Sequence, residues 1–150
     1  MPTVRPILLA EDNANDAELI VSALQQAHLA NEIVVTEDGE QALDFLHRRG
    51  RHAGRTGPQP GVILLDLKMP KVDGHEVLRQ IRSDPALRSL PVVILTSSRE
   101  ESDLLQTYQQ GVNAYVVKPV DFKEFTAAVG KLGCFWALLN ELPPERVSRA

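Results

Sequence analysis

The sequence has one cysteine, Cys134, which excludes an internal disulfide framework and indicates a reducing compartment, with Cys134 as a small apolar residue rather than a reactive thiol. No apolar run approaches the roughly 18 residues that a membrane-spanning helix requires. The first apolar run, at residues 7–10, is cut off by Glu11, so no signal peptide is indicated. We therefore expect a cytoplasmic protein that does not bind a membrane.

Clustered positive charge is also scarce. The net charge is −4, whereas a nucleic-acid surface requires grouped Lys and Arg side chains. The most basic stretch, "RRGRHAGR" at residues 48–55, is rich in glycine and lacks aromatic residues, which favours a solvated loop over a nucleic-acid site. The four histidines lack the spacing of metal ligands, and we expect them at the surface; they stand at positions 28, 47, 52 and 75.

What the sequence does contain is a regular alternation of short apolar runs with segments of helical periodicity. With 150 residues, 43% of them hydrophobic, the chain suits one globular domain with its own core. The apolar runs predict strands at 7–10, 33–35, 62–65, 92–95 and 114–117. The periodic segments predict helices at 14–28, 39–48, 73–83, 100–110 and 121–132. Runs that are apolar throughout suit strands covered on both faces, so we expect an α/β fold, a doubly wound (βα)5 sheet of five parallel strands.

Three of the predicted helices begin with an N-cap residue followed three positions later by Glu or Gln. These pairs are Asp38 with Gln41, Ser98 with Glu101, and Asp121 with Glu124. Two segments do not fit this arrangement of five strands and five helices. Residues 49–61 form an unusually long Gly/Pro/Arg loop, and residues 133–150 are too few for a further domain.

Polar side chains follow four of the five apolar runs. They are Glu11 and Asp12, Asp66, Thr96, and Lys118. The carboxyl ends of parallel strands meet at one edge of a sheet, where ligands bind in open α/β folds. Clustered carboxylates suit Mg²⁺, and a carboxylate can also attack phosphorus to form an aspartyl phosphate. A hydroxyl and an ammonium group could bind the oxygens of that phosphoryl group.

Each of these residues alone also has a purely structural interpretation. Glu11 and Asp12 could be first-turn acids of a helix, and Asp66 could be a turn residue. Thr96 could be an ordinary strand-end hydroxyl, and Lys118 a solvated side chain. Their joint occurrence at four strand ends favours the phosphoryl site.

Four motifs extend this argument to a family. "LLAEDN", "ILLDLKMPKVDG", "VVILTSS" and "AYVVKPVD" closely resemble the receiver domain of two-component response regulators, over residues 5 to 132. The resemblance implies a flavodoxin-like sheet with strand order 2-1-3-4-5. It also implies a receiver domain at 1–132, with residues 133–150 as a C-terminal extension and no separate output domain. Such a chain catalyses its own phosphorylation and dephosphorylation and is not a classical enzyme.

By this resemblance Asp66 is the phospho-acceptor, and the cofactor is Mg²⁺. Asp12 resembles the direct metal ligand and Glu11 an acidic partner that acts mainly through water, while the backbone carbonyl of Lys68 completes the ligands. The partner implied is a sensor histidine kinase.

The same resemblance assigns a switch. Thr96 and Tyr115 correspond to the switch pair, and Lys118 and Pro119 to a Lys-Pro pair whose bond is expected to be cis. Phosphorylation is then expected to rearrange the face made by the fourth helix, the fifth strand and the fifth helix, and so to change self-association or partner binding.

Two alternative functions would use some of the same residues. An aspartate-nucleophile phosphohydrolase shares the strand-end Asp and Mg²⁺, but such enzymes usually place a second Asp where this chain has Lys68. A flavodoxin-like cofactor binder would need a Gly- or Ser/Thr-rich phosphate loop after the first strand, and "EDNAND" is not one.

The apolar end of the chain suggests an interface. Its candidate residues are Phe135, Trp136, Leu138 and Leu139, in "FWALLNELPP". They either form an extra turn on their own domain or an exposed patch for self-association, and we expect a homodimer. This ending and the long basic loop also resemble single-domain regulators paired with bacterial and cyanobacterial phytochromes, which implies a bacteriophytochrome as the kinase.

Overall fold

The protein folds around one parallel five-stranded sheet. The structure, a computed structural model, describes residues 4–26, 31–118, 123–124, 127–128 and 131. The strands are β1 (Ile7–Ala10), β2 (Ile33–Thr36), β3 (Val62–Leu65), β4 (Val92–Thr96) and β5 (Ala114–Val117). They pair in parallel in the order β2-β1-β3-β4-β5, which confirms the predicted fold class and strand order.

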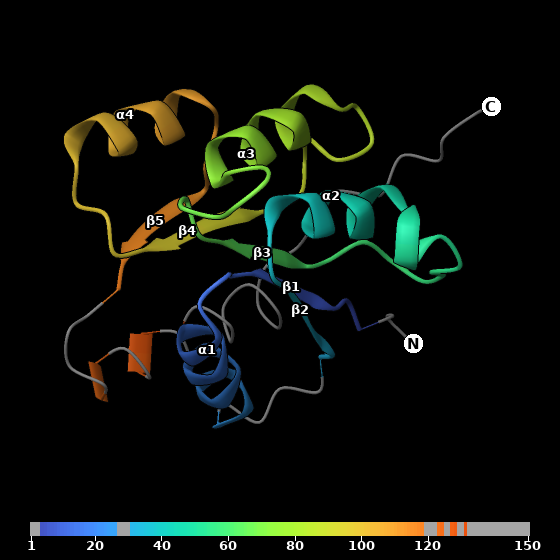
Figure 1. The fold of residues 1–150 in the computed structure, drawn as a ribbon, viewed down its shortest axis with the longest axis horizontal. Helices are drawn as coiled ribbons and strands as arrows, with labels where there is room; N and C mark the ends of the chain where they lie inside the picture. The colour runs from blue at the N-terminus through green and yellow to red at the C-terminus, as the bar shows by residue number, and fades with distance from the viewer. Residues whose placement is uncertain (1–3, 27–30, 119–122, 125–126, 129–130, 132–150) are drawn as a thin grey trace.

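The helices cover both faces of the sheet. They are α1 (Ala14–Gln26), α2 (Gly39–His47), α3 (Gly74–Ser83) and α4 (Glu101–Gln109), with a short 3-10 helix, η1 (Gly50–His52). Helix α1 lies on one face of the sheet, and α2, α3 and α4 lie on the other (Figure 1). Among the described residues, no helix is both long and apolar enough to cross a membrane.

Several predictions fall outside the described residues. Of the helix expected at 121–132, residues 123–124, 127–128 and 131 are described and are helical. The other predictions outside the described residues concern His28, the cis bond expected at Pro119, the N-cap expected at Asp121, Cys134, and the interface candidates Phe135, Trp136, Leu138 and Leu139.

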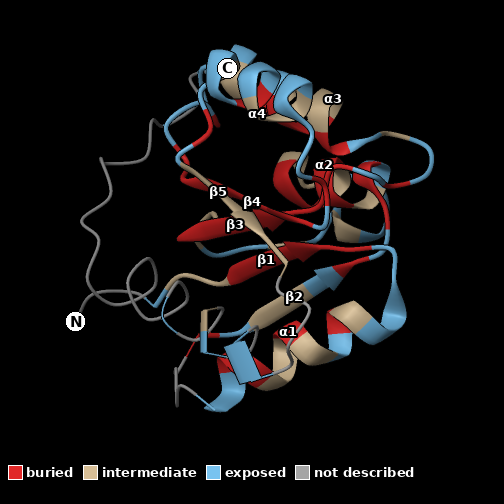
Figure 2. Ribbon diagram, turned by 90° about the vertical axis from the view of Figure 1, so that its left-hand side faces the viewer, coloured by how far each residue is buried: buried red, intermediate tan, exposed pale blue. Residues whose placement is uncertain are grey.

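The uninterrupted apolar runs are explained by two separate cores. Leu8 and Ala10 of β1 pack with residues of α2 and α3, whereas Ile7 and Leu9 pack with residues of α1. Because alternate side chains of a strand point to opposite faces, both sets are buried. Figure 2 shows β1, β3 and β4 buried along their length and the edge strands β2 and β5 less so.

One of the predicted helix starts is confirmed and another is wrong. Asp38 is the N-cap of α2, and its Oδ1 accepts the Gln41 N–H at 2.8 Å, as the spacing predicted. For α4 the prediction was wrong, because the N-cap residue is Glu100 and Ser98 does not cap the helix. The Ser98 Oγ instead accepts the Glu100 N–H at 3.3 Å, ahead of the helix, and its hydroxyl donates to Asp103 Oδ2 at 2.6 Å. Donation to a charged carboxylate is the stronger of these two bonds.

The long loop before β3 is held to the domain by its own basic residues. The Arg55 guanidinium lies 3.9 Å from the centre of the Phe45 ring and donates to the Phe45 carbonyl. The Arg48 side chain donates to the carbonyls of Arg55 and Gly57. The prediction of a solvated loop was therefore only partly right, since Arg48 and Arg55 bind the protein's own backbone.

Candidate functional site

The strand ends bring the predicted side chains together. The parallel ladder continues one residue beyond the strands, because the Asp66 N–H donates to the Ala10 carbonyl and the Lys118 N–H to the Thr96 carbonyl. The residues that follow β1, β3 and β5 therefore lie side by side at one edge of the sheet. Glu11, Asp66 and Thr96 are buried there.

The centre of this cluster is the Lys118 ammonium group. Its Nζ donates to Glu11 Oε1 at 2.5 Å, to Asp16 Oδ2 at 2.8 Å and to Asp66 Oδ2 at 3.0 Å. Only 10% of the Lys118 side chain is exposed, which excludes the alternative interpretation of Lys118 as a solvated side chain. The ammonium group offsets the repulsion among three carboxyl groups.

Proximity and burial set the protonation of the cluster. Burial, together with the neighbouring Asp66, raises the pKa of Glu11 to about 9. Burial also acts to raise the pKa of Asp66, but its interactions with Glu11 and Lys118 outweigh burial and the pKa falls below its usual value. Burial acts to lower the pKa of Lys118. Its hydrogen bonds to Asp16, Glu11 and Asp66 outweigh burial, and the pKa rises above its usual value. Asp66 is thus an ionised carboxylate at neutral pH.

The same carboxyl groups fit a divalent cation. Glu11, Asp12 and Asp66 each offer an oxygen, and these oxygens all lie within 4.8 Å of one another. Asp12 is exposed, and Glu11 Oε2 is buried without a hydrogen-bond partner among the described residues. An unpartnered buried oxygen beside two further carboxylates is the donor set that a hard cation such as Mg²⁺ takes.

The loop after β3 shapes the surroundings of Asp66. The Lys68 N–H lies 3.4 Å from Asp66 Oδ1, and the Lys68 side chain is exposed. Gly74, the first residue of α3, donates its N–H to the Leu67 carbonyl. A Cβ atom on Gly74 would lie 2.2 Å from the Asp66 carbonyl oxygen, so only glycine allows α3 to start this close to Asp66.

The two residues of the predicted switch pair lie on neighbouring strands. Thr96 ends β4, and its hydroxyl is one of the groups that lower the pKa of Asp66. Tyr115 pairs with Ile94 in the β4–β5 register, and its hydroxyl donates to the Ser98 carbonyl at 2.9 Å. The loop that follows Thr96 is therefore tied to Tyr115.

The sequence did not predict the contacts of two residues beside the site. His75 was expected at the surface, but its side chain is only 17% exposed, and Nε2 lies 2.9 Å from Asp103 Oδ1. Asp16 was not singled out, yet it binds Lys118. Asp16 lies in the first turn of α1, soon after the Glu11–Asp12 pair, but no spacing in the sequence marks it as a partner of Lys118. The His75–Asp103 pair, 28 residues apart, has no local signal.

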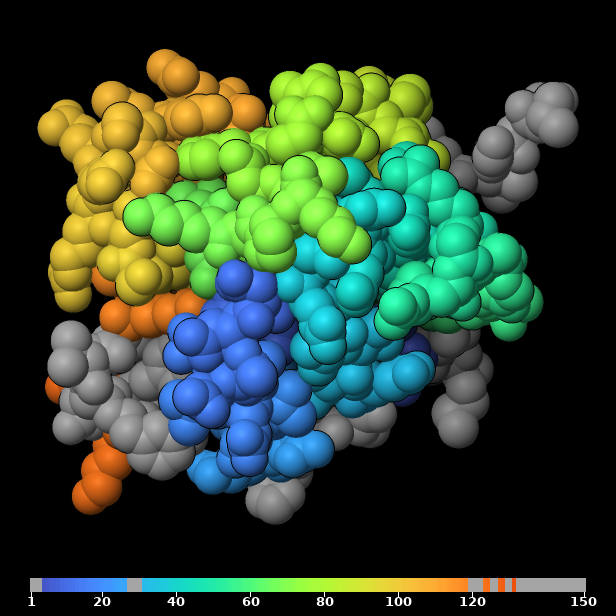
Figure 3. All heavy atoms as spheres, in the orientation of Figure 1, coloured from blue at the N-terminus to red at the C-terminus, as the bar shows by residue number. Residues whose placement is uncertain are grey.

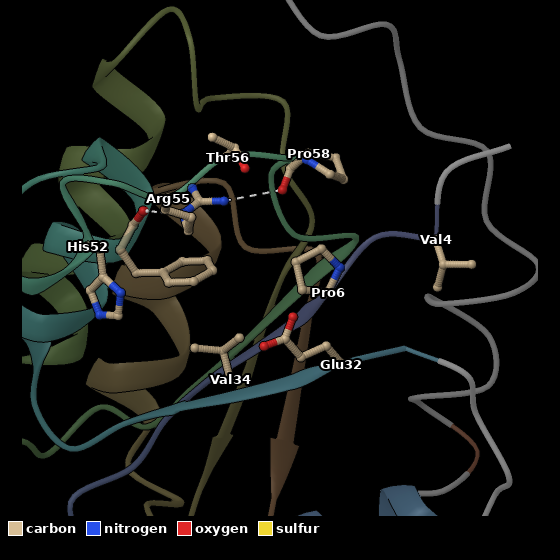
Figure 4. Close-up of a pocket in the computed structure, with 9 residues that line it drawn as sticks. Val4, Pro6, Glu32, Val34, His52, Arg55, Thr56 and Pro58 are labelled. Atoms are coloured by element: carbon tan, nitrogen blue, oxygen red, sulfur yellow. Dashed lines mark hydrogen bonds between the residues drawn. The ribbon is translucent and has the colours of Figure 1, made fainter.

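Two hollows of the described surface lie at opposite ends of the sheet. A shallow one beside the site is lined by Leu67, Lys68, Met69, Asp73, His75 and Asp103. On the face shown in Figure 3, the side chains of α3 lie between those of α2 and α4. A second hollow, of about 320 Å³, lies at the other end of the sheet, next to Pro6 and Glu32, which precede β1 and β2 (Figure 4). Arg55 lines it and donates to the Pro58 carbonyl.

The sequence and the fold match one family over most of the chain. The profile of the response regulator receiver domain matches residues 7–130. Response regulator Rcp1 of Synechocystis sp. is 37% identical over 91% of this chain and 92% of its own. The crystal structure of the Mn(2+)-bound form of Rcp1 matches with a TM-score of 0.86, at 36% identity, over 93% of this chain and 99% of that one.

Two further solved structures are similar. The bacteriophytochrome response regulator RtBRR is 58% identical, with a TM-score of 0.77, over 95% of this chain and 86% of its own. The phosphorylated cyanobacterial phytochrome response regulator RcpA is 37% identical, with a TM-score of 0.87, over 95% of this chain and all of its own, 100%.

Proposed function

Because the chain belongs to the response regulator receiver domain family, we propose that Asp66 accepts a phosphoryl group from a sensor histidine kinase in a Mg²⁺-dependent reaction. The observation that carries this proposal is the convergence of Asp66, Lys118 and the Glu11–Asp12 pair at the strand ends. The RcpA structure supports it as well, being that of a phosphorylated relative.

The proposed transfer is an attack on phosphorus. An ionised oxygen of Asp66 forms the new P–O bond while the P–N bond to the kinase histidine breaks, and the imidazole nitrogen keeps that electron pair and takes up a proton. The lowered pKa keeps Asp66 ionised and ready to attack. Lys118 and Thr96 bind the phosphoryl oxygens, since one supplies a charge and the other a hydroxyl donor.

Glu11, Asp12 and Asp66 are the residues proposed to hold Mg²⁺, with the Lys68 carbonyl as a further ligand. When bound, Mg²⁺ supplies positive charge that offsets the negative charge of the carboxylates and of the incoming phosphoryl oxygens. The Mn(2+)-bound form of Rcp1 supports a divalent cation, and the donor set favours Mg²⁺.

We propose that phosphorylation changes the surface that α4 and β5 contribute to. A phosphoryl group adds about −1.5 to −2 charges, which draws the Thr96 hydroxyl toward it. That movement would pull the loop to which Tyr115 is bonded through the Ser98 carbonyl. The exposed side chains of Leu105 and Tyr108 on α4 lie on the face that would change, which we propose as a surface for self-association or partner binding.

The input is proposed to be a bacteriophytochrome kinase, which the phytochrome-linked names of RtBRR and RcpA support. We further propose a cytoplasmic, homodimeric receiver made of residues 1–132, with residues 133–150 as an extension and no nucleic-acid target.

Labelled phosphate tests this function. Autophosphorylated histidine kinases, a phytochrome-type kinase among them, are mixed with the native protein, Asp66→Asn and Glu18→Gln, with and without Mg²⁺. Glu18 is an exposed acid of α1 and serves as the control. We expect Mg²⁺-dependent transfer to the native protein and to Glu18→Gln only. Absence of transfer from every kinase to a folded native protein would overturn the proposal.

A further inference from the structure

Asp16 binds the ammonium group of Lys118 from the first turn of α1. The Nζ–Oδ2 distance is 2.8 Å, and the two residues are 102 positions apart in the sequence. The Asp16 side chain is 35% exposed, so it reaches the cluster from its solvent side, whereas Glu11 and Asp66 are buried.

The carboxyl group of Asp16 is not needed to cap its own helix. Asn13 fulfils that role, because its Oδ1 accepts the Asp16 N–H at 3.0 Å and its carbonyl accepts the Ala17 N–H. The usual reason for an acid at this position, a hydrogen bond back to the cap, does not apply to a carboxylate that is bonded to Lys118 instead.

The three partners of Lys118 differ in a second respect. Glu11 and Asp66 belong to the group of carboxyl oxygens that could hold a metal ion, and Asp16 does not belong to that group. When Glu11 and Asp66 turn to a cation and a phosphoryl group, Lys118 exchanges two of its three carboxylate partners for the phosphoryl oxygens, and Asp16 is the one that it keeps. A lysine stem is flexible, so without a fixed partner its ammonium group would be drawn toward water during this exchange.

We propose that Asp16 is a positioning residue that keeps the Lys118 ammonium group at the strand ends while Glu11 and Asp66 engage the cation and the phosphoryl group. This inference rests on the proposed function. It assigns the four carboxyl groups two separate tasks: Glu11, Asp12 and Asp66 serve the metal and the phosphoryl group, and Asp16 serves the lysine.

The experiment is a double-mutant cycle between Asp16 and Lys118. Native protein, Asp16→Asn, Lys118→Ala and the double variant are titrated with Mg²⁺ alone, and then with beryllium fluoride in saturating Mg²⁺. Beryllium fluoride mimics a phosphoryl group on a carboxylate and requires no kinase. Asp16→Glu tests rescue by a longer carboxylate, and Glu18→Gln controls for the loss of one negative charge from α1.

We expect Asp16→Asn to weaken beryllium fluoride binding about tenfold, equivalent to about 1.4 kcal/mol. Mg²⁺ binding alone should change by less than about threefold, because Asp16 is not in the metal group. In the Lys118→Ala background the same substitution should change beryllium fluoride binding by less than about twofold, since an effect carried by the lysine disappears with it. Asp16→Glu should recover part of the loss, and Glu18→Gln should bind normally.

An equal loss in both backgrounds, or no loss in Asp16→Asn, would overturn the positioning role while leaving Asp66 as the acceptor. Failure of the native protein to bind beryllium fluoride in Mg²⁺ would overturn the proposed function and this inference together.

Discussion

His75 Nε2 lies 2.9 Å from Asp103 Oδ1, and this pair joins the first turns of α3 and α4 beside the proposed phosphoryl site. The other oxygen of Asp103 accepts the Ser98 hydroxyl, and the Ser98 carbonyl accepts the Tyr115 hydroxyl. Asp103 thus connects α3, α4 and the loop after Thr96 in one hydrogen-bonded arrangement. The chain of contacts runs across the face that the proposed switch has to rearrange.

Replacing Asp103 with asparagine should destabilise this arrangement. An amide offers one oxygen instead of two, so either Ser98 or His75 loses its acceptor, and the bond that remains is no longer charge-assisted. We expect the free energy of unfolding to fall by about 1 kcal/mol, because hydrogen bonds to charged groups contribute more than neutral ones. Urea unfolding measures the loss.

Glu101→Gln is the matched control for Asp103→Asn. Glu101 is also an acid in the first turn of α4, but it is exposed. An equal loss of stability in both variants would show a general effect of charge near the helix N-terminus and would contradict the role assigned to Asp103.

The effect of Asp103 should also depend on pH. Hydrogen bonds from Ser98 and His75 hold the pKa of Asp103 below its usual value of 3.8. A depressed pKa means that the carboxylate contributes its stability in full above the unfolded-state pKa and loses it as pH falls through the folded-state pKa. The difference in unfolding free energy between native protein and Asp103→Asn should therefore become smaller as the pH falls below about 4. A difference that does not become smaller below about pH 4 contradicts this prediction.

Glu11 should make Mg²⁺ binding depend on pH. Its pKa of about 9, raised by burial and by Asp66, means that Glu11 carries a proton in the metal-free folded protein at neutral pH. The unfolded chain loses that proton near pH 4.5, so the metal-free protein becomes less stable as pH rises from 4.5 to about 9. A cation that needs an ionised Glu11 must displace the proton, so its affinity should rise toward about tenfold per pH unit below pH 9.

Calorimetric titration with Mg²⁺ at pH 6, 7 and 8 checks this prediction. Repeating it in buffers with different heats of ionisation counts the protons released. Glu11→Gln should bind Mg²⁺ with a flatter pH dependence, since its side chain has no proton to release. If the native protein bound Mg²⁺ with the same affinity at all three pH values, Glu11 would not ionise on binding.

The strand ends could be read from the sequence because two conditions coincide there. Each buried strand is a continuous apolar run, and the parallel topology places the residue after every run at the same edge. Glu11, Asp66, Thr96 and Lys118 were therefore found without knowledge of any contact. Asp38 could be predicted as an N-cap because the N–H that it accepts belongs to Gln41, only three residues away.

Other contacts carry no such signal. Ser98 has the spacing of a capping residue, but its hydroxyl binds Asp103, two residues beyond the partner that the spacing predicts. His75 reaches Asp103 across 28 residues, and Asp16 reaches Lys118 across 102. Side chains that meet through the packing of separate helices are determined by the tertiary structure, and no periodicity in the sequence records them.

Lys68 should affect the lifetime of the phosphoryl group rather than the binding of the metal. Its side chain is exposed at the edge of the hollow beside the site, while its N–H lies near Asp66 Oδ1. Lys68→Ala retains the backbone N–H and carbonyl but removes the side chain, which we expect to affect access of water to Asp66. We expect a changed dephosphorylation rate with unaltered Mg²⁺ affinity, measured by loss of labelled phosphate and by calorimetry. An unchanged dephosphorylation rate would show that the Lys68 side chain does not control hydrolysis.

Gly74→Ala should displace Asp66 and destabilise the fold. In the first turn of a helix, alanine is otherwise favoured over glycine by up to about 1 kcal/mol. Here its Cβ would lie 2.2 Å from the Asp66 carbonyl oxygen and 2.7 Å from the Leu67 Cα, and backbone atoms cannot turn aside as a side chain could. We expect a net loss of about 2 to 3 kcal/mol in unfolding free energy and slower phosphorylation of the folded fraction.

Gly54→Ala is the control, because a Cβ at Gly54 meets nothing within 4 Å. Equal stability of the two variants would mean that α3 can shift away from Asp66 at no cost, and the close approach of Gly74 would then not position the acceptor.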